Sequence, residues 1–271
     1  MIDKLKYVYL LSFIKNSIFE IISVISSKNV VFVYQMGKVG SQSIRESLKT
    51  QGITAPHKHR LTYKTYKEYD IDFMKRPIYI LWLRKLLAKV VSKKKNLKII
   101  TLVREPIQRN ISEFFQHYNE LNYKGIYKGD PQEVFLSEFP QDIPLNWFDD
   151  ELKKVFGIDI YKYPFDREKG FTIISENNLD LLVIKLEELD NLEKQIGKFV
   201  GLKEFRLDTV NRASKKPYGE FYKYFKRNLK FTENYIEEMY NSKYMTHFYT
   251  QEEINAFKEK WKESIKDTQS V

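Results

Sequence analysis

A loop that contains glycine, lysine and serine follows the first short apolar segment of the chain, and its composition suits phosphate binding. The run Asn29–Tyr34 is β-branched and aromatic, which predicts a buried strand, and a helix is predicted over Ile44–Lys49. A junction of this kind directs backbone amides and the positive end of a helix at one spot, and glycines let the backbone approach a phosphate closely. The candidate phosphate-binding residues are Gly37, Lys38, Val39, Gly40, Ser41, Gln42 and Ser43.

A second set of anion-binding side chains follows a second predicted strand, Leu97–Val103. Arg104 comes directly after this strand, and Ser112 lies two turns into a helix that Pro106 is suited to begin. A planar guanidinium makes bidentate contacts to phosphate, and a serine at this spacing can face the same anion. Arg109 is a further candidate. The alternatives are an ion pair for Arg104 and an ordinary exposed position for Ser112.

The two motifs resemble those of sulfotransferases that use 3′-phosphoadenosine-5′-phosphosulfate (PAPS). The segment Gly37–Gln42 is similar to their 5′-phosphosulfate loop, often Pro-Lys-Ser-Gly-Thr-Thr, with glycine replacing proline and glutamine replacing the second threonine. Arg104 and Ser112 resemble their 3′-phosphate motif. A Walker A loop has its lysine after the second glycine, whereas Lys38 precedes Gly40. The resemblance implies PAPS as co-substrate, and a shared site requires Lys38 and Arg104 to lie within roughly 20 Å.

Later segments extend the resemblance, which spans roughly residues 30–225. Asp180–Leu189 is similar to a later strand and helix start of the superfamily, and Asn211–Gly219 is similar to its nucleotide-closing loop. The loop resemblance implies nucleotide contacts for Lys215, Lys216 and Tyr218. Pro144–Gly157 and Tyr163–Asp166 resemble a bacterial branch described as capsular polysaccharide synthesis proteins, which implies a carbohydrate acceptor. That branch carries Lys-Trp-Tyr-Ser in the closing loop, where this chain has proline and glycine instead of tryptophan and serine.

Two histidines end a short predicted strand near residues 53–56 and are candidates for the general base. An unperturbed imidazole titrates near pH 6.5 and can accept a proton at neutral pH. Polysaccharide sulfotransferases often use a histidine at an equivalent strand end, and this resemblance places His57 first and His59 second. Glu105 and Glu113 are alternative bases, and Lys38 would neutralise the departing phosphate.

The composition excludes some kinds of reactive site but does not identify a substrate. The chain has no cysteine, which excludes disulfides and thiolate sites, and its four histidines form no HExxH pattern, so we expect no metal. The net charge of +10 favours a polyanionic partner. A nucleotide kinase and a polyanion- or nucleic-acid-binding module are therefore the competing functions.

We expect a single α/β domain with a three-layer, P-loop-like sulfotransferase fold. Its short central parallel sheet is predicted from strands near 30–34, 53–56, 97–103 and 181–185, flanked by helices. Within residues 1–271, we expect an amphipathic helix over 1–27, a nucleotide-binding core over 28–230 and C-terminal helices over 231–271. Four aromatic residues are expected either to stack on sugar rings or to pack in the core: Tyr123, Tyr127, Trp147 and Phe148.

The N-terminal segment has apolar residues at helical spacing, which predicts packing against the body of the protein. These residues are Leu10, Phe13, Ile14, Ile18, Ile21, Ile22 and Ile25. Lys15 and Glu20 interrupt the segment, which disfavours a transmembrane span. We expect a cytoplasmic protein, with contact between this helix and a membrane surface as the alternative. The sequence leaves the oligomeric state open.

Overall fold

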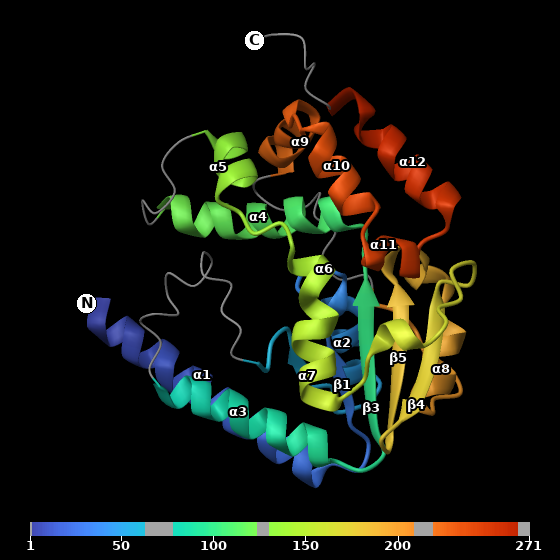
Figure 1. Ribbon diagram of the computed structural model, residues 1–271. Coiled ribbons are helices and arrows are strands. Elements are labelled where there is room, and N and C mark those ends of the chain that lie inside the picture. The colour runs from blue at the N-terminus through green and yellow to red at the C-terminus, as the bar shows by residue number, and fades with distance from the viewer. Residues whose placement is uncertain (1, 63–77, 124–129, 209–218, 265–271) are drawn as a thin grey trace.

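A five-stranded, mostly parallel sheet lies at the centre of the computed structural model, which describes residues 2–62, 78–123, 130–208 and 219–264 (Figure 1). The strand order is β2-β1-β3-β5-β4. The strands are β1 (Val31–Tyr34), β2 (His57–Lys58), β3 (Leu97–Val103), β4 (Phe171–Glu176) and β5 (Leu179–Lys185). Four strands run parallel and β4 pairs antiparallel with β5. The expected α/β class is confirmed.

Two details of the predicted sheet were wrong. The edge strand predicted near 53–56 is β2, which lies slightly later in the chain, at residues 57–58. The pairing with β1 begins before β2, where Thr54 O accepts from Val31 N at 3.0 Å, and continues to the end of β2. The sheet is also not wholly parallel, since β4 was missed. Asn177 and Asn178 both have positive φ, which suits the two-residue turn of a β-hairpin and explains how β4 folds back onto β5.

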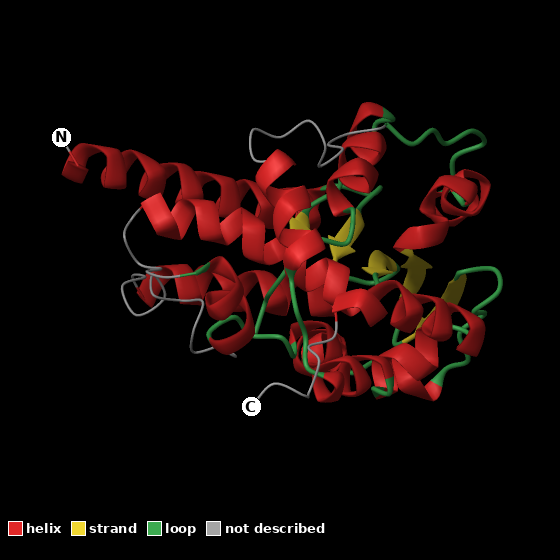
Figure 2. Ribbon diagram, turned by 90° about the horizontal axis from the view of Figure 1, so that it is seen from above, coloured by secondary structure: helices red, strands yellow, loops and turns green. Residues whose placement is uncertain are grey.

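Helices cover both faces of the sheet. Helix α2 (Ser41–Thr50) lies behind β1 in Figure 1, whereas α6 (Ile143–Trp147) and α7 (Lys153–Phe156) lie in front, joined by a π-helical turn, Phe148–Leu152. Helix α8 (Glu193–Val200) follows β5 after the short 3-10 turn Leu186–Asn191. Seen from above, the strands lie between these helices (Figure 2). Trp147 and Phe148 are buried in the core, so they are not sugar-stacking residues.

A second group of helices lies over the carboxyl ends of the strands (Figure 1). It contains α4 (Pro106–Tyr123), α5 (Pro131–Ser137), α9 (Gly219–Asn228), α10 (Glu233–Tyr240), α11 (Lys243–Phe248) and α12 (Gln251–Trp261). Aromatic rings fill the space between them: Phe114 stacks on Phe225 with centroids 5.6 Å apart, and Phe135 meets Phe114 edge-on at 5.2 Å. This packing fixes α4, which carries much of the candidate site.

The N-terminal helix α1 (Ile2–Ser26) packs along α3 (Ile78–Lys93) (Figures 1 and 2). Ile21 and Val24 are buried, but Ile18, Ile22 and Ile25 are exposed. The prediction that all of these pack on the body was therefore wrong in part, because the apolar positions spread over more of the helix surface than its neighbours cover. Among the described residues, no helix is long and apolar enough to cross a membrane.

Candidate functional site

The carboxyl ends of the parallel strands bring the predicted motifs to one edge of the sheet. The loop 35–40 follows β1, His59 follows β2, and Arg104 follows β3. From β1 the chain moves outward to β2, and from β2 it crosses back to β3 on the other side of β1. Ligands of open α/β sheets bind where the strand order reverses in this way. The space between the loops after β1 and β3 is therefore the expected ligand position.

The loop after β1 has the backbone shape that its glycines predict. Lys38 and Gly40 both have positive φ, 69° and 82°, and Gly40 is the N-cap of α2. Because glycine has no side chain, no side-chain cap occupies the positive end of α2, where the first backbone N–H groups of the helix have no intrahelical partner. A Cβ at Gly37 would lie 3.3 Å from Glu113 Oε1, and one at Gly40 would lie 2.5 Å from Leu186 Cδ1. Side chains at these two positions would therefore push the loop away from its neighbours.

Two arginines after β3 hold this loop from the side of α4. Arg104 Nη1 donates to Lys38 O at 2.8 Å, and Arg109 Nε donates to Gly37 O at 3.1 Å. Arg109 is buried and also pairs with Glu113. The two predicted phosphate motifs are therefore in direct contact, well within the separation that a shared nucleotide site requires.

The Lys38 ammonium also reaches across to α4, where it donates to Gln116 Oε1 at 2.9 Å. Ser112 is partly exposed one turn before Gln116 and, being four residues from it, lies on the same side of α4 as Gln116. In the loop itself, Val39 and Ser41 are buried, Ser43 is partly buried and Gln42 is exposed. Lys215, Lys216 and Tyr218 lie outside the described residues, as does Tyr127, and the side chain of Tyr123 is not described either.

Buried hydrogen bonds fix the start of α4 and remove one of the alternative bases. The Glu105 carboxylate is fully buried, accepts from Ile107 N and Gln108 N at 2.8 Å each, and also accepts from Tyr240 Oη at 2.7 Å. It therefore caps the helix and cannot reach an acceptor hydroxyl. Tyr244 Oη accepts a hydrogen bond from Arg104 N and donates one to Arg104 O, both at 2.9 Å. These two bonds fix the backbone of Arg104 at the end of β3.

The two histidines stand side by side but face different surroundings. Their rings are 4.5 Å apart and nearly perpendicular. His59 is exposed, and its Nδ1 lies 3.0 Å from Gln35 O. Because a carbonyl only accepts, this contact places the proton on Nδ1 and leaves Nε2 as the basic nitrogen. His57 Nε2 faces the Gln35 side-chain amide at the longer distance of 3.4 Å.

The electrostatic surroundings also separate the two histidines. Burial lowers the pKa of His57 to about 3, and the neighbouring His59 and Arg45 add to this effect. Desolvation by the surrounding protein also lowers the pKa of His59, although the residue keeps some exposed surface; the hydrogen bond to Gln35 O and the charge of Glu113 oppose the change. His59 therefore shares its surroundings with Arg109 and Glu113, next to the loop. His59 is thus the histidine beside Arg109 and Glu113, whereas the resemblance places His57 first as the candidate base.

His57 is also among the residues that line a hollow of about 680 Å³. It lies between α1, α2 and the segment before β2, and Phe19, Arg45, Lys49 and Lys58 are among its lining residues. Lys58 forms an ion pair with Glu20 of α1. His57 lines this hollow, and its ring contacts the ring of His59.

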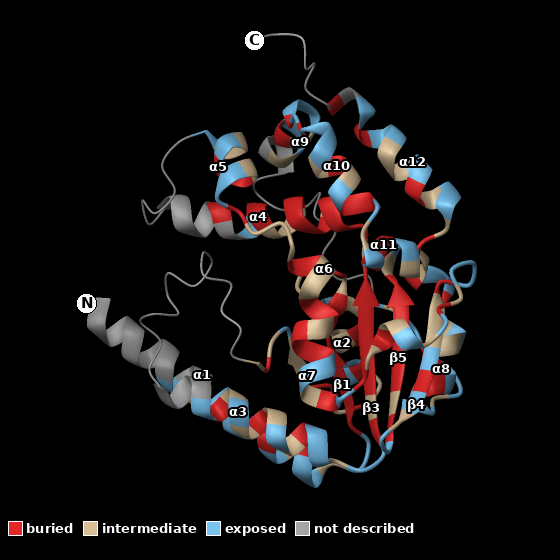
Figure 3. Cartoon of the chain, in the orientation of Figure 1, coloured by how far each residue is buried: buried red, intermediate tan, exposed pale blue. Residues whose placement is uncertain are grey.

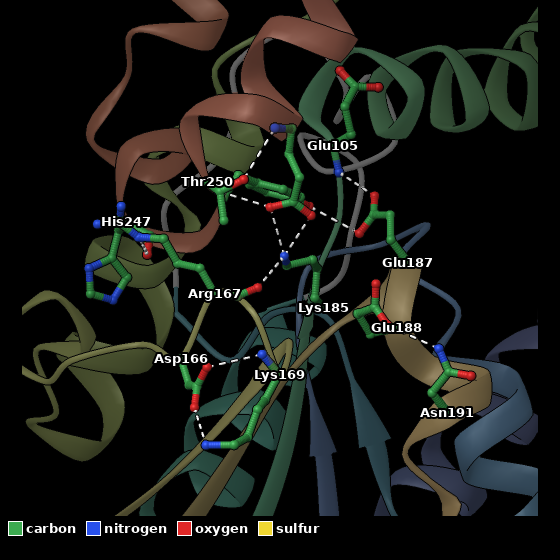
Figure 4. Close-up of polar contacts among 12 residues, drawn as sticks. Glu105, Asp166, Arg167, Lys169, Lys185, Glu187, Glu188, Asn191, His247 and Thr250 are labelled. Atoms are coloured by element: carbon green, nitrogen blue, oxygen red, sulfur yellow. Dashed lines mark hydrogen bonds and ion pairs between the residues drawn. The ribbon is translucent and has the colours of Figure 1, made fainter.

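The end of β5 forms the remaining wall of the edge and carries a dense polar network (Figure 4). Lys185 is buried, pairs with Glu253 at 2.7 Å and donates to Arg167 O at 2.8 Å, so its charge is compensated within the fold. Glu187 keeps contact with solvent and accepts from Glu105 N at 3.0 Å. Surrounding protein raises the Glu187 pKa, which this hydrogen bond partly opposes.

Sequence reasoning missed three polar residues of this edge. Gln35 contacts both histidines, Gln116 binds Lys38, and Glu187 accepts from the backbone at the start of α4. A signal for Gln35 was present, because it directly follows a buried strand at the edge where ligands bind. The position of Gln116 depends on the rotation of α4, which the sequence does not specify.

Comparisons with known proteins connect part of this chain with polysaccharide synthesis. A family model described as "Putative capsular polysaccharide synthesis protein" matches residues 132–250. The matched segment includes β5 and α11 but begins after the loop 35–43 and after Arg104. No curated protein and no solved structure matches the chain. The family match agrees with the predicted capsular polysaccharide resemblance in this segment and says nothing about sulfuryl transfer.

Proposed function

We propose that this protein is a PAPS-dependent sulfotransferase that acts on a carbohydrate hydroxyl. The observation that carries the proposal is the contact between Arg104 Nη1 and Lys38 O at 2.8 Å. It joins the loop that resembles a 5′-phosphosulfate site to the strand end that resembles a 3′-phosphate site. One ligand with phosphates at both positions would satisfy both sets of cationic groups.

In the proposed reaction, the acceptor hydroxyl loses its proton to His59 Nε2 while its oxygen forms a bond to sulfur. The bond between sulfur and the 5′-phosphate oxygen breaks, and the electron pair stays on that oxygen, which gives 3′,5′-ADP. Lys38 stabilises the negative charge that grows on the departing phosphate. Gln35 holds the His59 ring through its carbonyl, so that Nε2 remains the proton acceptor.

The hollow beside His57 is the proposed approach for the acceptor. Phe19 offers an aromatic surface, and Asn16, Ser17 and Thr54 offer polar groups for sugar hydroxyls. The family match over residues 132–250 supports a polysaccharide acceptor.

Affinity chromatography separates this proposal from its competitors. The protein should be retained on immobilised 3′,5′-ADP and released by free 3′,5′-ADP, but not by ATP or an oligonucleotide. Release by ATP would favour a kinase, and release by the oligonucleotide would favour a polyanion-binding module. Mass spectrometry of products from PAPS and a glycan panel would then identify the acceptor.

A further inference from the structure

An exposed apolar surface on α1 is not used by the proposed reaction. Leu11, Ile18, Ile22 and Ile25 are 63%, 44%, 55% and 64% exposed. Their spacing of seven, four and three residues places them on one side of the helix, and we call them the α1 stripe. The stripe is about 21 Å long at the rise of an α-helix. Ile21 and Val24 are buried and hold an adjoining side of α1 on the protein; Figure 3 colours the exposed and buried parts of this helix.

The helix beside this stripe, α3, and the segment that follows it are strongly basic. From Ile78 to Lys98 the chain has seven basic residues and no acidic one: Arg84, Lys85, Lys89, Lys93, Lys94, Lys95 and Lys98. Helix α3 also carries Trp82, which is 61% exposed. Helix α1 has two acidic residues, Asp3 and Glu20, and Glu20 is paired with Lys58. The α1 and α3 pair thus combines an apolar stripe, an exposed tryptophan and an excess of positive charge.

We propose that α1 and α3 bind the surface of a membrane that contains anionic lipids. A lysine keeps its ammonium group at the headgroups while its long stem covers apolar surface, and each basic residue near an anionic leaflet favours binding. An amphipathic helix with apolar residues on one side lies in the interface plane. A protein partner fits this surface less well, because lysine is depleted at the centres of protein–protein interfaces.

Vesicle sedimentation of the full chain tests the proposal. Vesicles of phosphatidylcholine with phosphatidylserine should bind the protein at least about tenfold more strongly than pure phosphatidylcholine vesicles, and added salt should weaken binding. The double variant Ile18→Ser/Ile22→Ser should lower the partition coefficient by about tenfold or more. Ile173→Ser is the matched control, because Ile173 is 48% exposed on the distant edge strand β4.

A charge-reversal pair tests the basic component separately. Lys85→Glu/Lys89→Glu on α3 should abolish the preference for phosphatidylserine, whereas Lys194→Glu/Lys198→Glu, exposed at the same spacing on α8, should retain it. Circular dichroism checks that each variant is folded. The proposal is overturned if the wild type binds neither vesicle, or if Ile18→Ser/Ile22→Ser binds as the wild type does. A third outcome also overturns it: the wild type binds no vesicles and is a dimer by light scattering, and Ile18→Ser/Ile22→Ser is a monomer. The stripe would then be an interface between two copies of the chain.

Discussion

Replacing His59 by alanine should remove the general base and leave the nucleotide site intact. The ring is exposed, and its Nδ1 contact with Gln35 O involves no group of the phosphate loop beyond that carbonyl. A positioned base contributes about 10²–10⁴ to the rate, so kcat of His59→Ala should fall by that factor. His57→Ala should lower kcat less than about tenfold, because it loses a contact of 3.4 Å.

Three measurements on the same variants check this reasoning. Calorimetry with 3′,5′-ADP should give wild-type affinity for both variants. Imidazole in the buffer should restore part of the activity of His59→Ala, since the vacated position is open to solvent. In the wild type, kcat/KM should fall at low pH with an apparent pKa below 6.5, because desolvation by the surrounding protein lowers the pKa of His59 and the protonated ring accepts no proton.

The opposite result would refute the assignment. If His57→Ala abolishes turnover while His59→Ala retains it, the base is His57, as the family resemblance suggested. If both variants turn over at the wild-type rate, neither histidine is the base, and Glu113, which pairs with Arg109 beside the loop, is the next residue to replace.

The other predictions concern the loop, the charge of Lys38 and acid stability. Lys38→Ala should lower kcat by more than it lowers 3′,5′-ADP affinity, since the ammonium acts on charge that grows in the transition state; equal losses in both would contradict that role. Gly40→Ala should lower the free energy of unfolding in urea by about 2–3 kcal/mol, because alanine is strained at positive φ and Leu186 must move. Gly52→Ala has a similar φ and open space around it, so its loss should be about 1–2 kcal/mol; equal losses would show that Leu186 does not constrain the loop. His57→Gln should be less sensitive to acid than the wild type. The pKa of His57 is about 3 in the native protein and near 6.5 in the unfolded chain. Between these two pH values the unfolded chain binds a proton at His57 that the native protein does not bind, so the stability of the wild type falls as the pH decreases from 6.5 toward 3. Between pH 6.5 and 5 the difference should reach at most about 2 kcal/mol, and parallel stability curves would show that His57 is not desolvated in the native state.

The central strands and the two motif positions could be predicted because they depend on local patterns. Short β-branched runs predicted β1, β3 and β5, and the parallel arrangement then placed Lys38 and Arg104 at one edge. Gly37 and Gly40 predicted a tight loop between β1 and α2, and Gly40 has the positive φ that glycine favours.

Features that depend on tertiary packing could not be predicted in the same way. The choice between His57 and His59 depends on which ring contacts Gln35 O and which charged groups lie beside each ring, and the residue spacing specifies neither. Glu105 was a candidate base by composition, but the packing of Tyr240 against the start of α4 makes it a helix cap. The exposed face of α1 could not be predicted either, because the spacing of apolar residues does not show how much of a helix its neighbours cover.

Calorimetric titration of 3′,5′-ADP into the wild type, Arg104→Ala and Arg206→Ala tests the shared nucleotide site most directly. Arg206 is 78% exposed and lies close to Glu193 of α8, so its replacement controls for the loss of one positive charge. The wild type and Arg206→Ala should bind equally well, and Arg104→Ala should bind about ten- to a hundredfold more weakly, since a charged hydrogen bond contributes about 1.5–3 kcal/mol. Equal affinity in all three proteins, or no binding by the wild type, would contradict the assignment of this edge of the sheet as a PAPS site.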